Sequence, residues 1–225
     1  GLFQVRAAFS PFLTVQVVAF PQDGFAGGTA ALMEEALERG ADVVGGIPWT
    51  EPDEAAQHAH IGRCFALAET YGKPLHMVCD DTTDPASRTL QYLARGTLER
   101  GFRGQVAATQ CAALAFYDDA HAAEVIALVR EAGLTVFSNA HVSLVTTERR
   151  GEPYPRGLTR VAELLEAGVP VACAQDDIDN PYYPFGRNDM LEVAHYMAHA
   201  GGFGWEPERV LPMVTTTPAR ALGLP

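Results

Sequence analysis

Residues 170–187 read PVACAQDDIDNPYYPFGR, and this stretch carries the clearest structural signal in the chain. Its apolar start, 171–174, suits a short buried strand that breaks off at Asp176 and Asp177. Two prolines and a glycine then prevent a regular element, so the two carboxylates lie where a strand meets its loop. In a parallel α/β barrel that edge is where catalytic groups gather. An aspartate turn that bonds its own backbone would explain the same residues, and both interpretations stay open at this point.

The length allows one large domain or two small ones, and because no linker, charge run or low-complexity segment divides the sequence, we expect a single domain over residues 1–225. The chain has 225 residues and a mass of 24.2 kDa, and it is 48% hydrophobic and 20% charged, which is enough to bury a core. A net charge of -12 with a pI near 4.9 argues against nucleic acid as a partner, because phosphate binding needs a basic face. The longest apolar runs are only strand-sized, so we expect no membrane partner. The sequence is compatible with both a monomer and a homo-oligomer.

The spacing of the cysteines does not indicate a zinc knuckle. They are widely spaced and form no CxxC pair: Cys64, Cys79, Cys111 and Cys173. Each lies in an apolar segment, so we expect buried free thiols in a cytoplasmic protein.

Short apolar runs alternate with amphipathic helical patterns along the whole chain. We expect strands at 15–20, 43–47, 75–79, 105–108, 134–138 and 169–174. We expect helices at 30–39, 54–71, 86–100, 120–131 and 159–166, most of them followed by a glycine that can end them. Such regular alternation predicts parallel βαβ units.

A barrel is favoured over a doubly wound sheet for two reasons. No glycine-rich phosphate loop follows any of the predicted strands. Polar residues also follow nearly every strand, as they do in barrel enzymes: Gln22 and Asp23, Asp80 and Asp81, Gln110, Asn139 and His141, and Asp176 and Asp177. We therefore predict an α/β fold of the (β/α) TIM-barrel type.

Four segments together resemble the cytosine deaminase branch of the amidohydrolase superfamily: VQVVAFPQDG (15–24), ADVVGGIP (41–48), CDDTTDPASRTL (79–90) and QDDIDNPYYPFGRNDML (175–191). The segment TTTPARALGL (215–224) is similar to the helix that closes such a barrel. The resemblance implies an eight-stranded barrel of which this chain supplies the third to eighth strands, so the first two would come from polypeptide outside it. It also implies hydrolysis of a non-peptide C–N bond in a small cytosine-like heterocycle, with a zinc or iron ion that activates water.

The resemblance assigns roles to several of the polar residues. Asp176 falls on the family's metal-ligating, catalytic aspartate, and Asp81 falls on its proton-shuttling glutamate. Asp177 matches an acid that contacts the substrate, and Gln22 matches the glutamine that holds the substrate's amide edge. Gln110 stands where the family has a histidine near the bound water, and we expect it to contact the substrate.

The family's set of metal ligands is incomplete here. Its first-strand His-x-His pair has no counterpart, and its fifth-strand histidine falls on Val78. Asp176 is left as the only predicted ligand, and one carboxylate does not hold zinc or iron. We expect either a divalent metal, zinc or iron, completed by residues outside this chain, or no metal in this chain.

The histidines differ in merit as site candidates. His141 follows the 134–138 strand, and we expect it at the rim as a substrate-binding residue. His76 would lie one layer deeper than Val78, where a core histidine is the simpler explanation. Two pairs fall in helical patterns, where packing is again the simpler explanation: His58 with His60, and His195 with His199.

Three functions stay open on the sequence. The first is an amidohydrolase-type enzyme that cleaves C–N bonds of a small heterocycle. The second is a metal-free barrel that has lost this chemistry and serves as a binding protein or subunit. The third is a metal-free reaction in which Asp81, Asp176 and Asp177 act as acid and base. We favour the first, because a rim this polar costs stability to maintain without a use.

Overall fold

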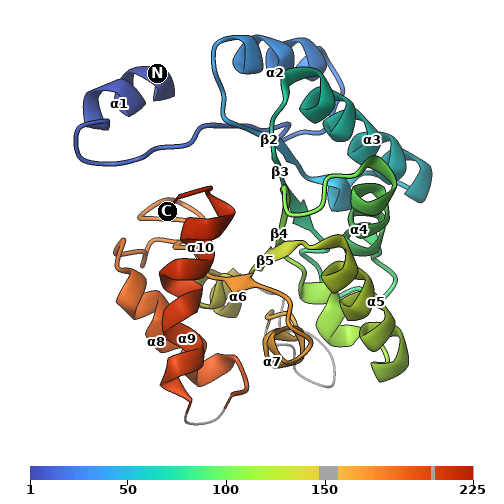
Figure 1. Ribbon diagram of the computed structural model, residues 1–225, viewed down its shortest axis with the longest axis vertical. Helices are drawn as coiled ribbons and strands as arrows, with labels where there is room; N and C mark the ends of the chain where they lie inside the picture. The colour runs from blue at the N-terminus through green and yellow to red at the C-terminus, as the bar shows by residue number, and fades with distance from the viewer. Residues whose placement is uncertain (147–156, 204–205, 225) are drawn as a thin grey trace. The chain divides into compact units, whose positions relative to one another are not determined.

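The computed structural model describes residues 1–146, 157–203 and 206–224, and Figure 1 shows its helices and strands. The chain divides into two compact units, Gly1–Met77 and Val78–Pro225. The strands form a sheet in the order β1-β2-β3-β4-β5-β6, parallel in each pair whose register is described. The strand order never reverses, which is the topology of successive βα units in a barrel rather than of a doubly wound sheet. The predicted α/β class with a parallel sheet is confirmed.

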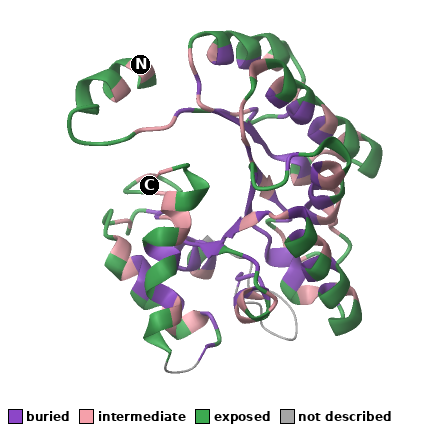
Figure 2. Ribbon diagram, viewed as in Figure 1, coloured by how far each residue is buried: buried purple, intermediate pink, exposed green. Residues whose placement is uncertain are grey.

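The first unit alternates strands and helices from its N-terminus onward. It contains α1 (Leu2–Phe9), β1 (Val18–Ala19), α2 (Thr29–Glu38), β2 (Val43–Gly46), the 3-10 turn η1 (Pro48–Thr50), α3 (Glu54–Tyr71) and the start of β3 (Leu75–Cys79). Val18 pairs with Val43, and Val44 pairs with Leu75. Every residue of β2 is buried, as Figure 2 shows by its colour and as is typical of a central parallel strand.

Helix α3 occupies the predicted span because its ends carry strong signals. The Asp53 side chain accepts a hydrogen bond from the backbone N–H of Ala56 at 2.8 Å, which caps the start. Gly72 ends the helix at a φ of 62°, where glycine carries no steric cost.

Two glycines let the layers of the first unit approach closely. A Cβ atom on Gly45 would lie 2.5 Å from Cδ2 of Phe20 and 2.8 Å from Cγ1 of Val18. A Cβ atom on Gly46 would lie 3.0 Å from Sγ of Cys64. Side chains at these two positions of β2 are therefore excluded by the packing around them.

The second unit continues the alternation. It contains the end of β3, α4 (Thr89–Arg100), β4 (Val106–Gln110), the 3-10 turn η2 (Ala112–Phe116), α5 (Asp119–Ala132), β5 (Thr135–Phe137), α6 (Ala140–Thr146), α7 (Val161–Glu166), β6 (Val171–Ala172), α8 (Met190–Ala200), α9 (Pro207–Val214) and α10 (Thr216–Ala221). Helix α4 packs on α5, and α9 packs on α8, α10 and β6, as Figure 1 shows. The β4 strand is buried along its whole length, so the core of this unit surrounds it.

The element boundaries differ from the prediction in several places. Strands β1 and β6 have only two residues each, shorter than the predicted 15–20 and 169–174. Helix α4 begins at Thr89 rather than at 86, because the preceding residues form a hydrogen-bonded loop. Three helices escaped prediction: α1, which buries no residue, α6, which starts within three residues of β5, and α9, which contains Pro212.

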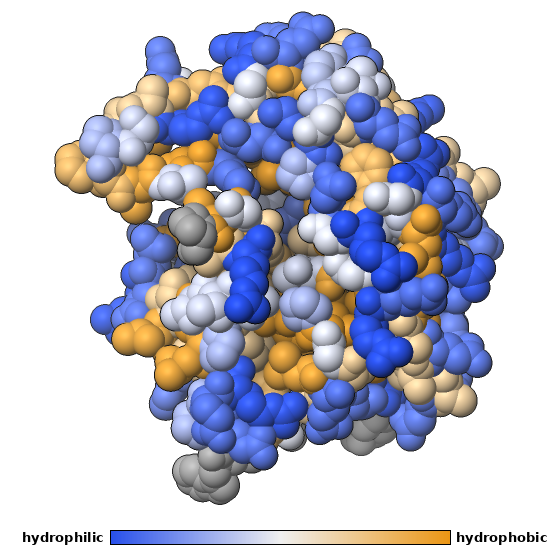
Figure 3. All heavy atoms as spheres, in the orientation of Figure 1, coloured by the Kyte–Doolittle hydropathy of each residue, from blue (hydrophilic) through white to orange (hydrophobic). Residues whose placement is uncertain are grey.

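Polar and apolar residues both reach the surface. Figure 3 shows hydrophilic and hydrophobic residues interspersed over the visible face, which is ordinary for a folded chain. Within the residues that the structure describes, no helix combines the length and the apolar character needed to cross a membrane. Whether residues 1–225 behave as a single domain stays a prediction.

The close approach at β2 leads to a test of stability. Gly45→Ala should lower the free energy of unfolding by about 1–3 kcal/mol, because the new methyl group overlaps Phe20 and Val18. Gly62→Ala is the matched control: it lies within α3, nothing lies within 4 Å of its added Cβ, and it should stabilise by about 0.5–1 kcal/mol. Urea unfolding of both variants measures the difference. Equal stability of the two variants would contradict this packing.

Candidate functional site

Four strand ends of the second unit bring polar residues together. Asp81 follows β3, Gln110 ends β4, Asn139 follows β5 and Asp176 follows β6. Parallel strands end at the same edge of a sheet, and barrel enzymes build their sites at this edge.

The backbone at three of these strand ends takes an uncommon conformation. Asp80 has a φ of 48°, Gln110 a φ of 69°, and Asp176 a φ of 62°. Cys111, next to Gln110, has a φ of 53°. Residues other than glycine seldom adopt positive φ, and such outliers cluster at functional sites.

A hydrogen-bonded chain orients the carboxylate of Asp176. Oγ of Ser143 donates to Oε1 of Gln110 at 3.1 Å, which leaves the amide nitrogen of Gln110 facing the other way. That nitrogen, Nε2, donates to Oδ2 of Asp176 at 2.7 Å. The side chain of Gln110 therefore fixes the orientation of the Asp176 carboxylate.

Asn139 fastens the start of the Asp176 loop to the sheet. Its Oδ1 accepts a hydrogen bond from the backbone N–H of Ala174 at 3.1 Å, and its Nδ2 donates to Oγ1 of Thr109 at 3.4 Å. Both groups of the Asn139 side chain are thus used to connect β4 with the segment after β6. Sequence reasoning placed Asn139 at a strand end and gave it no role.

Asp81 and Asp176 are electrostatically coupled. Loss of hydration raises the pKa of Asp81 to about 6, and the negative charge of Asp176 adds to this rise. Loss of hydration also raises the pKa of Asp176, as does the charge of Asp177, while hydrogen bonds from Gln110 and Asn139 oppose the rise. Both Asp81 and Asp176 keep solvent-exposed surface, so a small molecule can reach them. A carboxyl group with a pKa near 6 can hold or release a proton close to neutral pH.

Asp177 lies beside this pair and is engaged within its own loop. Its Oδ1 accepts a hydrogen bond from Nδ2 of Asn180 at 2.6 Å. The aromatic residues of the same loop differ in their exposure to solvent: Tyr183 is buried, whereas Tyr182 and Phe185 are exposed. The contact of Asp177 with a substrate stays a prediction.

His141 is buried rather than open at the rim. Only 3% of its surface is exposed, and its Nε2 lies 2.9 Å from Nε2 of Gln175. Its ring meets Tyr183 edge to face at 5.2 Å and stacks near Tyr196 at 6.2 Å. Burial lowers the pKa of His141, so the neutral ring is favoured. The predicted role of His141 in substrate binding is not tested by this placement.

Gln22 and His76 belong to the first unit. Gln22 is exposed and follows β1, and its predicted hold on the amide edge of a substrate stays a prediction. His76 is partly buried in β3, and burial lowers its pKa to about 4. The neutral ring of His76 is therefore favoured, as expected of a core histidine.

The remaining histidine pairs lie on helices as predicted. On α3, His58 is exposed and His60 is buried, so the two face different directions. Nε2 of His60 accepts a hydrogen bond from the backbone of Ile47 at 3.0 Å, and its Nδ1 lies 2.8 Å from Oε1 of Glu51. The rings of His195 and His199 are 4.4 Å apart on one face of α8.

The residues present do not fit the zinc or iron site that the resemblance implies. Among the described residues, no three His, Cys, Asp or Glu side chains come together as ligands for one ion. Val78 has no donor atom, and Oδ2 of Asp176 already accepts the hydrogen bond of Gln110. Asp176 by itself is one ligand where a structural or catalytic zinc site needs three or four.

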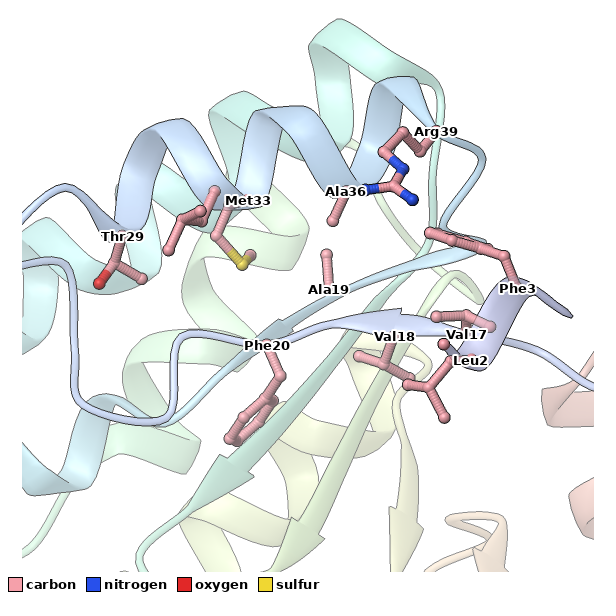
Figure 4. A pocket seen from close by; sticks show the side chains of 12 residues that line it. Leu2, Phe3, Val17, Val18, Ala19, Phe20, Thr29, Met33, Ala36 and Arg39 are labelled. Atoms are coloured by element: carbon pink, nitrogen blue, oxygen red, sulfur yellow. The ribbon is translucent and has the colours of Figure 1, made fainter. Parts of the chain in front are cut away.

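A cavity of about 390 Å³ in the first unit is a poorer candidate for catalysis. It lies between α1, β1 and α2, and Figure 4 shows its apolar lining with Met33 and Phe20 at its walls. Arg39 is the only charged side chain among the lining residues, and it pairs with Glu35 at 3.0 Å. The cavity offers no acid and base that could move a proton.

The raised pKa of Asp81 has a consequence for stability. The folded protein holds this proton more tightly than the unfolded chain, so ionised Asp81 destabilises the fold as the pH rises from about 4 through 6. Asp81→Asn should therefore raise the Tm at pH 7.5, and the gain should shrink as the pH is lowered towards 4. Thermal unfolding across this pH range measures the effect. Asp84→Asn, an exposed carboxylate in the same loop, should give no pH-dependent gain, and a Tm of Asp81→Asn that never exceeds the parent's would contradict the assignment.

Comparison with known proteins supplies the family. The model of the Amidohydrolase family matches residues 7–225. A pterin deaminase from Rhizobium rhizogenes is 31% identical over 230 residues, which cover 99% of this chain and 51% of that protein. The chain thus spans about half the length of the curated relative that it matches.

Solved structures agree with this result. A 5-methylcytosine deaminase from Klebsiella pneumoniae, liganded with phosphonocytosine, superimposes with a TM-score of 0.94 at 35% identity, over 99% of this chain and 55% of that one. An N-isopropylammelide isopropylaminohydrolase from Burkholderia multivorans superimposes with a TM-score of 0.84 at 26% identity, over the same shares of the two chains. The predicted resemblance to the cytosine deaminase-like branch is confirmed. On its sequence and on its fold, this chain belongs to the amidohydrolase family.

Proposed function

We propose that this chain belongs to a hydrolase that cleaves the exocyclic C–N bond of a small nitrogen heterocycle and releases ammonia or an amine. The observation that carries the proposal is the pair of Asp81, after β3, and Asp176, after β6, at the carboxyl edge of one sheet, with the pKa of Asp81 raised to about 6. Relatives named as deaminases of pterin and 5-methylcytosine support the substrate class.

The two carboxyl groups would divide the proton transfers of this reaction. Gln110 donates a hydrogen bond to Asp176, which favours the carboxylate and suits it to accept a proton from water. The water oxygen bonds to the ring carbon that carries the exocyclic nitrogen. Protonated Asp81 gives its proton to that nitrogen as the C–N bond breaks. The heterocyclic amine and water thus become the heterocyclic carbonyl compound and ammonia, or the free amine.

Substrate binding would come from the polar residues to which the family resemblance assigns it. Asp177 could accept hydrogen bonds from ring N–H groups, and Gln22 could hold an amide edge, as the resemblance implies. We assign His141 to the same task, and because its ring is buried against Gln175 and Tyr183, it would have to turn outward to touch a substrate.

The chief alternative is a binding barrel that has lost the chemistry of its relatives. Val78 supports this alternative, since it stands where the family has a metal ligand. The two functions differ in one respect: an enzyme turns over its ligand, whereas a binding protein returns it unchanged.

Turnover tests the proposal directly. The protein should release ammonia from at least one of cytosine, 5-methylcytosine and pterin, or isopropylamine from N-isopropylammelide. Asp81→Asn and Asp176→Asn should each lower kcat by roughly 10²- to 10⁴-fold, the usual contribution of a general acid or base. Asp84→Asn should stay within about twofold of the parent, because its exposed carboxylate only caps a turn at Ala86. Binding of these compounds without any turnover would favour the binding barrel.

Metal content gives an independent test. We expect the chain to hold zinc or iron at well below one ion per chain, because Asp176 is its only family ligand. Val78→His should tighten zinc binding by adding an imidazole at the strand end, whereas Val78→Ala, the control, should not. Elemental analysis and calorimetric titration with zinc measure both. One tightly held ion per parent chain would refute the expectation.

A further inference from the structure

We propose that Asp80 is a positioning residue, which fixes the direction in which Asp81 leaves the end of β3 and therefore its placement relative to Asp176. This inference rests on the proposed function, in which Asp81 acts as the proton donor. Asp80 is not exposed to a substrate, since only 1% of its surface is accessible. Its effect must therefore pass through its neighbour in the chain.

The Asp80 side chain is held by five hydrogen bonds. Oδ1 accepts from Oγ of Ser87 at 2.6 Å, from the backbone N–H of Thr89 at 2.7 Å and from Oγ1 of Thr89 at 2.6 Å. Oδ2 accepts from the backbone N–H of Leu90 at 3.0 Å and from Oη of Tyr117 at 3.4 Å. A buried carboxylate is stable only with such a set of donors.

Two of these donors are the first backbone N–H groups of α4. Thr89 and Leu90 begin that helix, and their N–H groups have no partner within it. The positive end of the helix dipole favours a negative charge at this place. Asp80 is thus tied to a rigid element rather than to a mobile loop.

The backbone of Asp80 is fixed as well. Its N–H donates to Oγ1 of Thr89 at 3.1 Å, and its carbonyl accepts from the N–H of Ala113 at 3.1 Å. These bonds lie on both sides of the residue and hold its φ at 48°, an angle that is uncommon for residues other than glycine. The direction in which the chain leaves Asp80 decides where Asp81 points.

Tyr117 connects this cluster to the segment after η2. The single proton of its hydroxyl is shared between Oδ2 of Asp80 and the carbonyl of Ser87, and the guanidinium of Arg88 lies 4.4 Å from the centre of its ring. Nη2 of Arg160 donates to the carbonyl of Tyr117 at 2.7 Å. The end of β3, the start of α4 and the segment after η2 are therefore held by one network around Asp80.

A competing account makes Asp80 a helix cap and nothing more. The two accounts agree that loss of Asp80 lowers the Tm. They differ on Asp81: a mere cap leaves the coupling between Asp81 and Asp176 intact, whereas a positioning residue does not.

The test uses Thr89→Val, which removes the hydroxyl that bonds both the side chain and the backbone N–H of Asp80 and keeps the shape of Thr89. Thr82→Val is the matched control, because Thr82 lies in the same loop and bonds only the N–H of Asp84 among the contacts described. Asp80→Asn and Tyr117→Phe remove other parts of the network. Each variant is combined with Asp176→Asn, and the NMR shift of the Asp81 carboxyl carbon is read at one fixed pH.

In the parent and in Thr82→Val, Asp176→Asn should move the Asp81 carboxyl signal by the same amount. In Thr89→Val and Asp80→Asn the movement should fall to less than half of that in the parent. If Asp80→Asn fails to fold, the same reduction in Thr89→Val and in Tyr117→Phe supports the proposal. A lower Tm with an undiminished movement would overturn the proposal and leave Asp80 as a helix cap.

Kinetics supply a second readout wherever a substrate is turned over. Thr89→Val should lower kcat by roughly 10- to 100-fold, since misplacement of a catalytic group by about 1 Å has costs of that order, with KM within about twofold of the parent. A rise in KM with unchanged kcat would count against positioning. The NMR readout needs no turnover, so it separates the two proposals. If the parent protein turns over no substrate but the movement of the Asp81 signal still falls in Thr89→Val, the proposed function is refuted and the positioning role of Asp80 stands.

Discussion

The hydrogen bond from Gln110 to Asp176 is the interaction on which the arrangement of the site depends. It joins the end of β4 to the segment after β6, which are separated by 66 positions in the chain. Ser143, from α6, sets the orientation of the Gln110 amide, so three elements converge on one carboxylate oxygen. The amide of Gln110 thus connects the ends of two strands that are not neighbours in the sheet.

Two acidic groups close together oppose folding, and the fold contains compensating contacts nearby. The oxygen and the nitrogen of the Asn139 amide both form hydrogen bonds, which connect the segment before Asp176 to β4. The carboxylate of Asp80 accepts hydrogen bonds from five donor groups. For the carboxylate of Asp81, the next residue, the structure describes no hydrogen bond. Adjacent residues in the sequence thus have opposite tasks: one carboxylate is satisfied and structural, and the next keeps its capacity for proton exchange.

The sequence predicted the fold well where the periodic signal is strong. Helices α3 and α5 and strand β3 fall on their predicted positions, because caps, glycine stops and apolar patterns agree there. Helix α1 was missed because it buries nothing, and a helix without a buried face has no stripe to detect. The ends of β1 and β6 were overestimated, since an apolar run does not reveal where ladder hydrogen bonds stop.

The polar residues at the strand ends were recognisable in the sequence, whereas the contacts between them were not. Strand-end position was enough to select Asp81, Gln110 and Asp176. It could not reveal that Ser143 orients Gln110, because that contact joins residues 33 positions apart. Nor could it separate the tasks of Asp80 and Asp81, since the donors around Asp80 come from a helix start and from Tyr117. Such contacts depend on packing, which pattern reasoning does not contain.

The positive φ angles at Asp80, Gln110 and Asp176 also restrict how this family member can change over evolutionary time. Glycine and asparagine accept such angles at small cost, whereas β-branched residues do not. A lineage that no longer needed the carboxylates could therefore replace them with glycine or asparagine and keep its fold. Replacement by valine or isoleucine would remove the chemistry and strain the strand ends in the same step. Relaxed selection at this rim should thus leave a trace of small and amide residues.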